Sequence, residues 1–283
     1  MEKQKLLFFL HIPKTAGTTM NTIMRSNFGK SSIIHLNKPY QHAESLREQW
    51  SVKGSRARLV SGHFPYGIHE HIDVEPAYFA VIRNPYERVY SFYKYILNTP
   101  THYYHKELTE KRWTFEEFLR DGTVPEVSNQ QVRLLTGCKV DSKAVNEETY
   151  AEAIANIHKH FSLVGVQDRF EQTLALMKIK LGLRSIRHYS KNVRKESAPI
   201  KFDEGELQLL NQTNFFDMKL YSYVCDYFAS QVEENRKLIQ DELQLLNAQN
   251  KSLRFRTYSY VLEKIDDPRR NITKKISKLL SQK

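Results

Sequence analysis

The feature that most constrains this chain is a strand-sized apolar run that leads through a glycine-containing turn into a helical pattern. Residues 6–12 are almost wholly apolar, which is typical of a parallel strand buried on both faces. The turn 13–19 follows, and beyond it apolar residues recur at helical spacing from Met20 to Phe28. A strand, a tight turn and a helix in this order predict an α/β fold.

The same alternation recurs further along the chain. Residues 78–82 form a second strand candidate, and Pro85 suits the first position of a helix that we expect to reach about residue 97. Residues 162–166 predict a third strand, followed by a cap-like helix start at Asp168 and a stop at Gly182. Further helices are expected at 150–160, within 203–229, and from a capping box at Thr114 to near Gly122. The pattern predicts a P-loop-like central parallel sheet flanked by helices, with a C-terminal helical extension.

Composition and charge narrow the class of partner. The chain has 283 residues, 40% hydrophobic and 12% aromatic, which is a folding composition. Its formal net charge of +11 favours anionic partners, among them phosphates, sulfates and acidic glycans. The two cysteines, Cys138 and Cys225, are too few for a disulfide framework. No apolar run reaches membrane-spanning length and no cleavable leader is recognised, so we expect a cytoplasmic protein; a Golgi lumen location is the alternative if an anchor has been removed.

The last 51 residues differ in character from the rest. Residues 233–283 carry 12 basic and 7 acidic side chains, a net of +5. Val232, Ile239, Leu246 and Leu253 repeat every seven residues, which predicts an amphipathic helix. We therefore divide the chain into a domain at 1–232 and a basic helical tail at 233–283. The tail offers a surface for a second copy of the chain, and a membrane-surface contact also stays open.

The turn after the first strand has the chemistry of an anion site. Unpaired main-chain N–H groups and the positive end of a helix both point at such a turn. Lys14 adds a cation, and three threonine hydroxyls add donors. The segment lacks the G-x-x-x-x-G-K-[ST] spacing of the nucleotide-triphosphatase loop, and its Lys14 precedes the glycine. The predicted binding residues here are Pro13, Lys14, Thr15, Ala16, Gly17, Thr18 and Thr19.

A second anion site is predicted where the 78–82 strand ends. Arg83 follows that strand, and open α/β sheets bind ligands at the carboxyl ends of their strands. Ser91 lies one to two helical turns past Pro85, so it can face the same side. An arginine fork and a hydroxyl suit a terminal phosphate. The alternative for Arg83 is an ion pair at the helix end with Glu87.

His63 is the candidate general base. It follows a strand-like stretch at 59–62, and an imidazole suits proton transfer near neutral pH. His69 and His71 are rivals for the same role. A metal site from these three histidines and Asp73 is disfavoured, because no two of the histidines have the i, i+4 spacing of a helical ligand pair.

These motifs carry a resemblance to a known family. His11-Ile-Pro-Lys-Thr-Ala-Gly-Thr-Thr19 resembles the 5′-phosphosulfate loop of sulfotransferases, especially the carbohydrate enzymes related to heparan sulfate 2-O- and 6-O-sulfotransferases and their bacterial relatives. Ala16 stands where many relatives have glycine. The resemblance covers roughly residues 5–228 and implies that Lys14 reaches the oxygen bridging phosphate and sulfur. It also implies that Arg83 and Ser91 hold the 3′-phosphate, that His63 is the catalytic histidine, and that a late loop with Asn192 and Arg194 closes over the adenosine.

The sequence thus predicts an O-sulfotransferase that uses 3′-phosphoadenosine 5′-phosphosulfate (PAPS), without a metal, and sulfates a hydroxyl of a glycan, which an acidic polysaccharide would suit. The expected reaction is in-line displacement with His63 as base and Lys14 on the leaving oxygen. Nucleic acid is not an expected partner. The rival classes are a nucleotide-dependent kinase or hydrolase, and a basic protein that binds acidic polymers or membranes.

Overall fold

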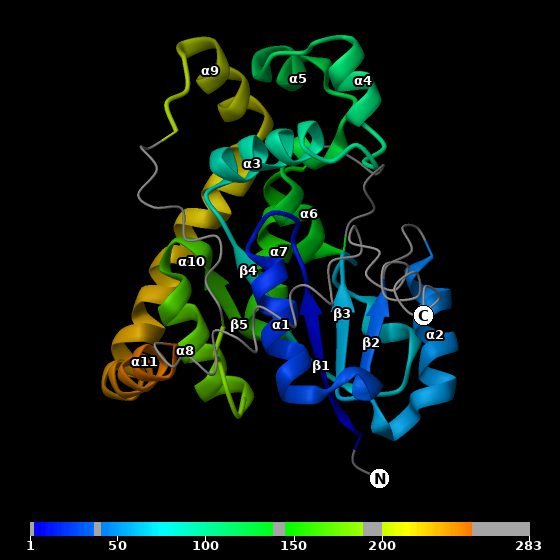
Figure 1. Ribbon diagram of the computed structural model, residues 1–283, viewed down its shortest axis with the longest axis vertical. Coiled ribbons are helices and arrows are strands. Elements are labelled where there is room, and N and C mark those ends of the chain that lie inside the picture. The colour runs from blue at the N-terminus through cyan, green and yellow to red at the C-terminus, as the bar shows by residue number, and fades with distance from the viewer. Residues whose placement is uncertain (1–2, 37–40, 138–144, 189–199, 251–283) are drawn as a thin grey trace, which may run out of the picture.

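A five-stranded parallel sheet forms the centre of the computed structural model, which describes residues 3–36, 41–137, 145–188 and 200–250 (Figure 1). The strand order is β2-β3-β1-β4-β5, and every adjacent pair is parallel. This is the α/β architecture expected from the sequence. The strands are β1 (Lys5–Leu10), β2 (Ile33–Leu36), β3 (Leu59–Gly62), β4 (Glu75–Ile82) and β5 (Phe161–Val166).

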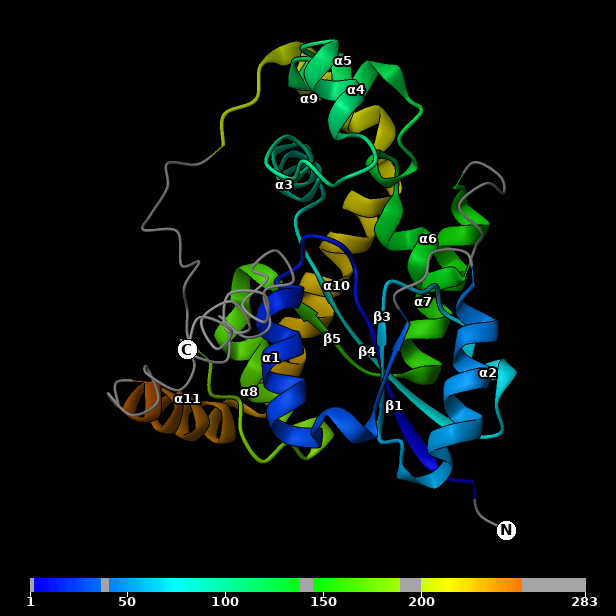
Figure 2. The same ribbon diagram turned by 45° about the vertical axis from the view of Figure 1, so that its right-hand side comes forward.

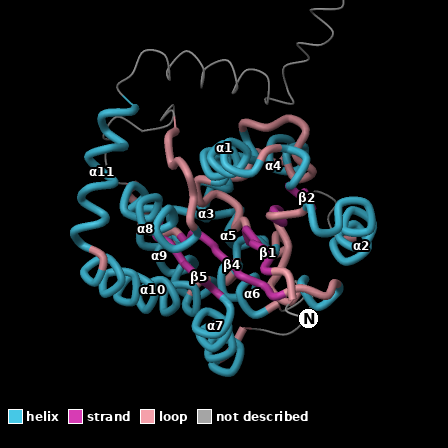
Figure 3. The backbone as a smooth tube through the Cα atoms, turned by 90° about the horizontal axis from the view of Figure 1, so that it is seen from below, coloured by secondary structure: helices cyan, strands magenta, loops and turns pink. Residues whose placement is uncertain are grey.

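Helices cover both faces of this sheet. Figure 3 shows α1 and α8 on one side and α7 on the other, while α10 packs beside β5. The described helices are α1 (Gly17–Phe28), α2 (His42–Lys53), α3 (Pro85–Leu97), α4 (His105–Glu110), α5 (Phe115–Asp121), α6 (Gln130–Thr136), α7 (Glu147–His160), α8 (Phe170–Leu181), α9 (Glu204–Thr213), α10 (Phe215–Glu234) and α11 (Arg236–Asn250).

The middle strands are buried because their apolar side chains face helices on both sides. Phe8 and Phe9 of β1 are fully buried and point to opposite faces, where they stack on Tyr78 and Phe79 of β4. The predicted strand at 6–12 is therefore present, although it ends at Leu10. β1 lies between β3 and β4, so the loops that follow these three strands meet at one edge of the sheet.

A second apolar core lies beyond the carboxyl ends of the strands. Helices α3, α4, α5 and α9 form this upper layer (Figures 1 and 2). Its buried side chains include Phe92, Ile96 and Phe118, and Leu210 of α9 joins them. The layer faces the strand ends, so the loops of the sheet edge lie between two separately packed cores.

The helix predicted in the tail is present as α11. Its Ile239 and Leu246 are each 2% exposed and join the main core, whereas Leu238 and Leu245 are half exposed. α11 packs on α8, where Lys178 also pairs with Glu242. The proposed division after residue 232 falls within α10, and residues 251–283 lie outside the described part of the chain. Among the described residues, no helix is both long and apolar enough to cross a bilayer.

Candidate active site

The loop between β1 and α1 forms an anion-binding turn. Lys14 and Ala16 both adopt left-handed backbone conformations, with φ of 72° and 64°. The buried hydroxyl of Thr15 donates to the main-chain oxygen of Ile12 at 2.8 Å and closes the turn. Ala16 is the N-cap of α1 and supplies no side-chain cap, and the first turn of α1 carries no acidic residue. The first N–H groups of α1 thus have no partner within the helix and favour a bound anion.

Gly17 opens α1 because the imidazole of His11 occupies the space beside it. A Cβ atom on Gly17 would lie 1.5 Å from Nε2 of His11. The His11 ring stacks on Phe9 with centroids 5.3 Å apart and lies 4.2 Å from the ring of His63. Burial, with smaller effects of His63 and Lys14, lowers the pKa of His11 to about 3. His11 is therefore a neutral packing group that joins the loop to the end of β3.

His63 follows β3 and is held in one tautomer. Its Nδ1 donates to the main-chain oxygen of His11 at 2.7 Å, so in the neutral ring Nε2 carries the lone pair. The side chain keeps solvent-accessible surface. Desolvation by the surrounding protein lowers its pKa from 6.5, partly offset by the bond to His11. A ring that is neutral at pH 7 and carries its lone pair on Nε2 can accept a proton there.

The rival histidines have contacts of their own. Nδ1 of His69 lies 2.9 Å from the hydroxyl of Tyr78, and its ring packs among Phe8 and Tyr66. His71 contacts Arg47. Within the described ranges, no group of three or more His, Cys, Asp or Glu side chains is arranged to hold a metal ion.

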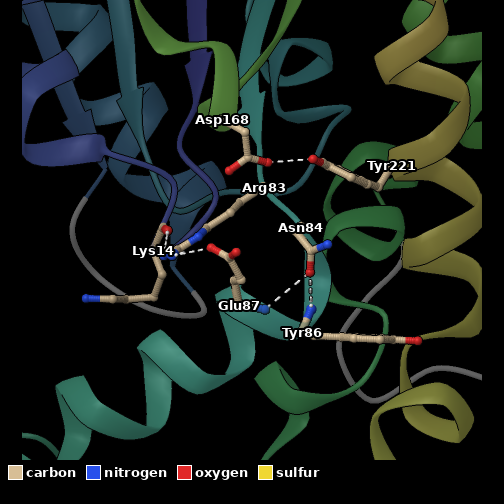
Figure 4. A network of polar contacts seen from close by, with 7 residues as sticks. All are labelled: Lys14, Arg83, Asn84, Tyr86, Glu87, Asp168 and Tyr221. Carbon is tan, nitrogen blue, oxygen red and sulfur yellow. Dashed lines mark hydrogen bonds and ion pairs between the residues drawn. The ribbon is translucent and has the colours of Figure 1, made fainter. Parts of the chain in front are cut away.

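Arg83 lies at the end of β4, directly against the Lys14 turn. Its Nη1 approaches the main-chain oxygen of Lys14 at 3.5 Å, and its Nη2 pairs with Glu87 at 2.9 Å (Figure 4). The ion pair that the sequence offered as an alternative for Arg83 is thus present. The side chain of Arg83 is largely buried, and its Nε has no hydrogen-bond partner in the described structure. A buried N–H without a partner is the kind of donor that a bound phosphate would satisfy.

The side chain of Lys14 points away from Arg83 (Figure 4). Its Nζ lies over the ring of Tyr95 on α3, 4.3 Å from the centroid. Burial, and secondarily the charge of Arg83, lowers the pKa of Lys14 to about 8. Two cationic side chains therefore lie at the turn, and a bound anion would relieve their mutual repulsion.

Long-range hydrogen bonds hold Arg83 in place. The Gln131 amide accepts from the Arg83 N–H and donates to the Arg83 carbonyl, both at 3.0 Å. The buried carboxylate of Asp217 on α10 accepts from the N–H groups of Gln131 and Val132, at 3.1 and 2.8 Å. Asn129 in turn accepts from the N–H of Asp217. Asp217 thus caps α6, and α6 holds Arg83 in a clamp. No local sequence signal predicts this linkage, because it joins residues far apart in the chain.

A further polar pair lies at the same edge. Tyr221 of α10 donates to Asp168, which follows β5 just as Arg83 follows the paired strand β4 (Figure 4). Asp168 belongs to a 3-10 turn, and the N-cap of α8 is Arg169 without a side-chain cap. The expected helix start at Asp168 is therefore wrong.

The remaining predicted site residues have plainer surroundings. Thr18 is exposed and Thr19 partly buried at the start of α1, Pro13 is partly buried in the turn, and Ser91 is partly buried on α3. Asn192 and Arg194 lie outside the described residues. The structure thus brings the turn, His63 and Arg83 to one edge of the sheet.

A model of the sulfotransferase family matches residues 1–224. Among solved structures, mouse sulfotransferase SULT7A1 complexed with PAP is 14% identical with a TM-score of 0.36, and the alignment covers 77% of this chain and 68% of that chain. No curated protein matches the chain.

Proposed function

Because this chain belongs to the sulfotransferase family, we propose that it transfers the sulfuryl group of PAPS to a hydroxyl group of a carbohydrate. The observation that carries the proposal is the contact between the Arg83 guanidinium and the Lys14 turn, since it joins two anion-binding elements into one site. A donor with phosphates at both its 5′ and 3′ positions needs two such elements. The kinase alternative needs only the first.

The turn residues would hold the 5′ end of the donor. The N–H groups at the start of α1 and the hydroxyls of Thr18 and Thr19 supply donors to the 5′-phosphosulfate. Arg83, whose buried Nε lacks a partner among the described residues, would bind the 3′-phosphate together with Ser91. These residues fit a bisphosphorylated nucleotide in charge and in donor number. From the family resemblance, Asn192 and Arg194 would contribute to a loop that closes over the adenosine.

His63 is proposed to act as the general base. Its Nε2 would accept the proton of the acceptor hydroxyl while the acceptor oxygen bonds to sulfur. The bond between sulfur and the bridging phosphate oxygen breaks, and its electron pair leaves with adenosine 3′,5′-bisphosphate (PAP). Lys14, protonated at pH 7 because its pKa is about 8, would stabilise the charge on that oxygen. The reaction needs no metal in this scheme.

A carbohydrate is the proposed acceptor for two reasons. The turn resembles that of the carbohydrate enzymes, and the net charge of +11 suits an acidic polysaccharide. We also propose a cytoplasmic location for the protein and pairing of two chains through the C-terminal helix.

An isotope experiment tests the function. PAPS carrying ³⁵S would be incubated with the full chain and a panel of unsulfated and sulfated oligosaccharides, small alcohols and peptides. We expect label in at least one oligosaccharide, and loss of that label in Lys14→Ala and in Arg83→Ala. Transfer of label to alcohols or peptides alone would refute the carbohydrate acceptor. Failure of the wild-type chain to bind PAP would refute the whole proposal.

A further inference from the structure

An aromatic strip crosses the surface beside Lys14. We define it as Tyr95 at the end of α3, together with His102 and Tyr103 in the segment that follows. The rings of Tyr95 and His102 meet edge to face with centroids 5.5 Å apart. The rings of His102 and Tyr103 stack at 4.4 Å and 21°. The three rings thus form one continuous series.

The two tyrosines of the strip lie outside the core, whereas the His102 ring packs edge to face on buried Phe92, with centroids 5.6 Å apart. Tyr95 is 39% exposed and Tyr103 is 67% exposed, and neither belongs to the two apolar cores. The inner face of α3 packs through other residues, Phe92 and Ile96. Neighbouring exposed aromatic rings mark an interaction surface more often than isolated ones do.

The strip is also held in position. The hydroxyl of Tyr103 donates to Oε1 of Glu126 at 2.6 Å, which limits rotation of the ring. Burial lowers the pKa of His102 below its usual 6.5, and the nearby charge of Glu126 offsets part of this shift. The imidazole is therefore neutral at pH 6.5 and above, where it packs as an aromatic ring. A fixed ring loses less conformational entropy when a ligand binds than a mobile one.

Lys14 connects the strip to the proposed reaction. Its Nζ lies 4.3 Å from the centre of the Tyr95 ring. Lys14 marks the end of the donor where sulfur is transferred, and the acceptor must approach that same end. The strip therefore begins where an acceptor has to lie and leads away from it across the surface of the upper helical layer.

We propose that this aromatic strip is an acceptor subsite that binds sugar rings adjoining the one that receives the sulfuryl group. The inference rests on the proposed function and adds residues to it. The C–H face of a pyranose is apolar and packs flat on an aromatic ring, whereas its hydroxyls stay at the edge in water. Tyr103, the most exposed of the three rings, would bind the sugar unit further from Lys14.

Tyr103 is the residue that tests the strip, because Tyr95 also contacts Lys14. Initial rates of ³⁵S transfer would be measured with PAPS against increasing concentrations of the best oligosaccharide from the panel above. We expect Tyr103→Ala to raise the acceptor KM by roughly three- to tenfold, the range for one aromatic stacking contact. Its kcat, its dissociation constant for PAP and its melting temperature should stay near wild type.

Two variants serve as matched controls. Tyr103→Phe keeps the ring but removes the bond to Glu126, so its KM should rise by much less than that of Tyr103→Ala. Phe215→Ala removes an exposed aromatic ring on α10 and should also leave KM unchanged. An unchanged KM in Tyr103→Ala, or an equal rise in Tyr103→Phe, would overturn the subsite while transfer to sugar persists. Absence of label in every sugar with the wild-type chain would overturn the proposed function itself, and the subsite with it.

Discussion

The Nδ1–H of His63 donates to the main-chain oxygen of His11, at 2.7 Å, and so ties the proposed base to the residues that lead into the Lys14 turn. The bond leaves Nε2 as the basic atom of the neutral ring. Because the acceptor is a main-chain oxygen, the identity of the side chain at position 11 does not alter it. His63 therefore keeps its tautomer as long as β1 and β3 stay paired.

We expect His63→Ala to remove transfer and to spare donor binding. Loss of a general base costs about 10²–10⁴-fold in rate, whereas the proposed phosphate contacts lie on other residues. Transfer of ³⁵S and binding of PAP by calorimetry would be measured on the same protein. His69→Ala, which removes a ring held by Tyr78, is the matched control and should retain the rate. Normal transfer by His63→Ala would show that another group is the base.

The pH profile should be bell-shaped, with its alkaline side set by Lys14. The acid side falls as His63 becomes protonated, and its lowered pKa moves that fall below pH 6.5. Lys14 must keep its proton to stabilise the leaving oxygen, so kcat/KM for PAPS should fall above about pH 8. Donor phosphates favour the charged amine, so the alkaline limb of kcat should lie at higher pH. In Lys14→Arg, any remaining activity should lack this limb, because arginine keeps its proton; a limb that persisted there would belong to a different group.

Gly17→Ala should disrupt the turn by displacing His11. The added methyl group would meet Nε2 of His11 at 1.5 Å, and overpacking of this kind costs about 1–3 kcal/mol of unfolding free energy. We expect weaker PAP binding and a lower midpoint of denaturation. The double variant His11→Ala Gly17→Ala frees the space and leaves the main-chain oxygen that His63 needs, so it should recover much of both losses. No recovery would mean that Gly17 is required for another reason, such as close approach of a ligand.

Gln131→Leu should weaken donor binding indirectly, through the position of Arg83. It leaves the main-chain N–H and carbonyl of Arg83 without partners, which costs about 1–3 kcal/mol for each group that stays buried. Gln49 provides a matched control, since its amide makes the same pair of bonds to His35 on β2. Both leucine variants should unfold at lower denaturant concentration, but only Gln131→Leu should lose PAP affinity. Equal PAP affinity in the two variants would argue against a role of the clamp in donor binding.

The sequence predicted the elements whose signals are local. The helix from Pro85 to Leu97 was predicted at its correct bounds, because proline suits the first helical position and an apolar stripe follows. The capping box of Thr114 and Glu117 is present as expected. β2, at Ile33–Leu36, was not predicted, because four residues are too few to show a period. The start at Asp168 failed because its carboxylate bonds to Tyr221, 53 residues away, and does not cap the helix.

The candidate site divides in the same way. The turn, His63 and Arg83 were predictable because each follows a strand, and the ends of neighbouring parallel strands meet. The contacts of Gln131 with Arg83 and of Lys14 with Tyr95 were not, since each joins residues far apart in the chain. The roles of Lys14, His63 and Arg83 in transfer, and the role of Ser91, stay predictions.

The cap that Asp217 places on α6 has a consequence for how the protein matures. A growing chain releases Lys14, His63, Arg83 and Ser91 from the ribosome well before it releases α10. Until then the clamp on Arg83 lacks its buried carboxylate, even though β1, β3 and β4 have already been synthesised. The nascent polypeptide would thus carry the proposed catalytic side chains without a finished anion site, and competence for the proposed transfer would arise late in translation.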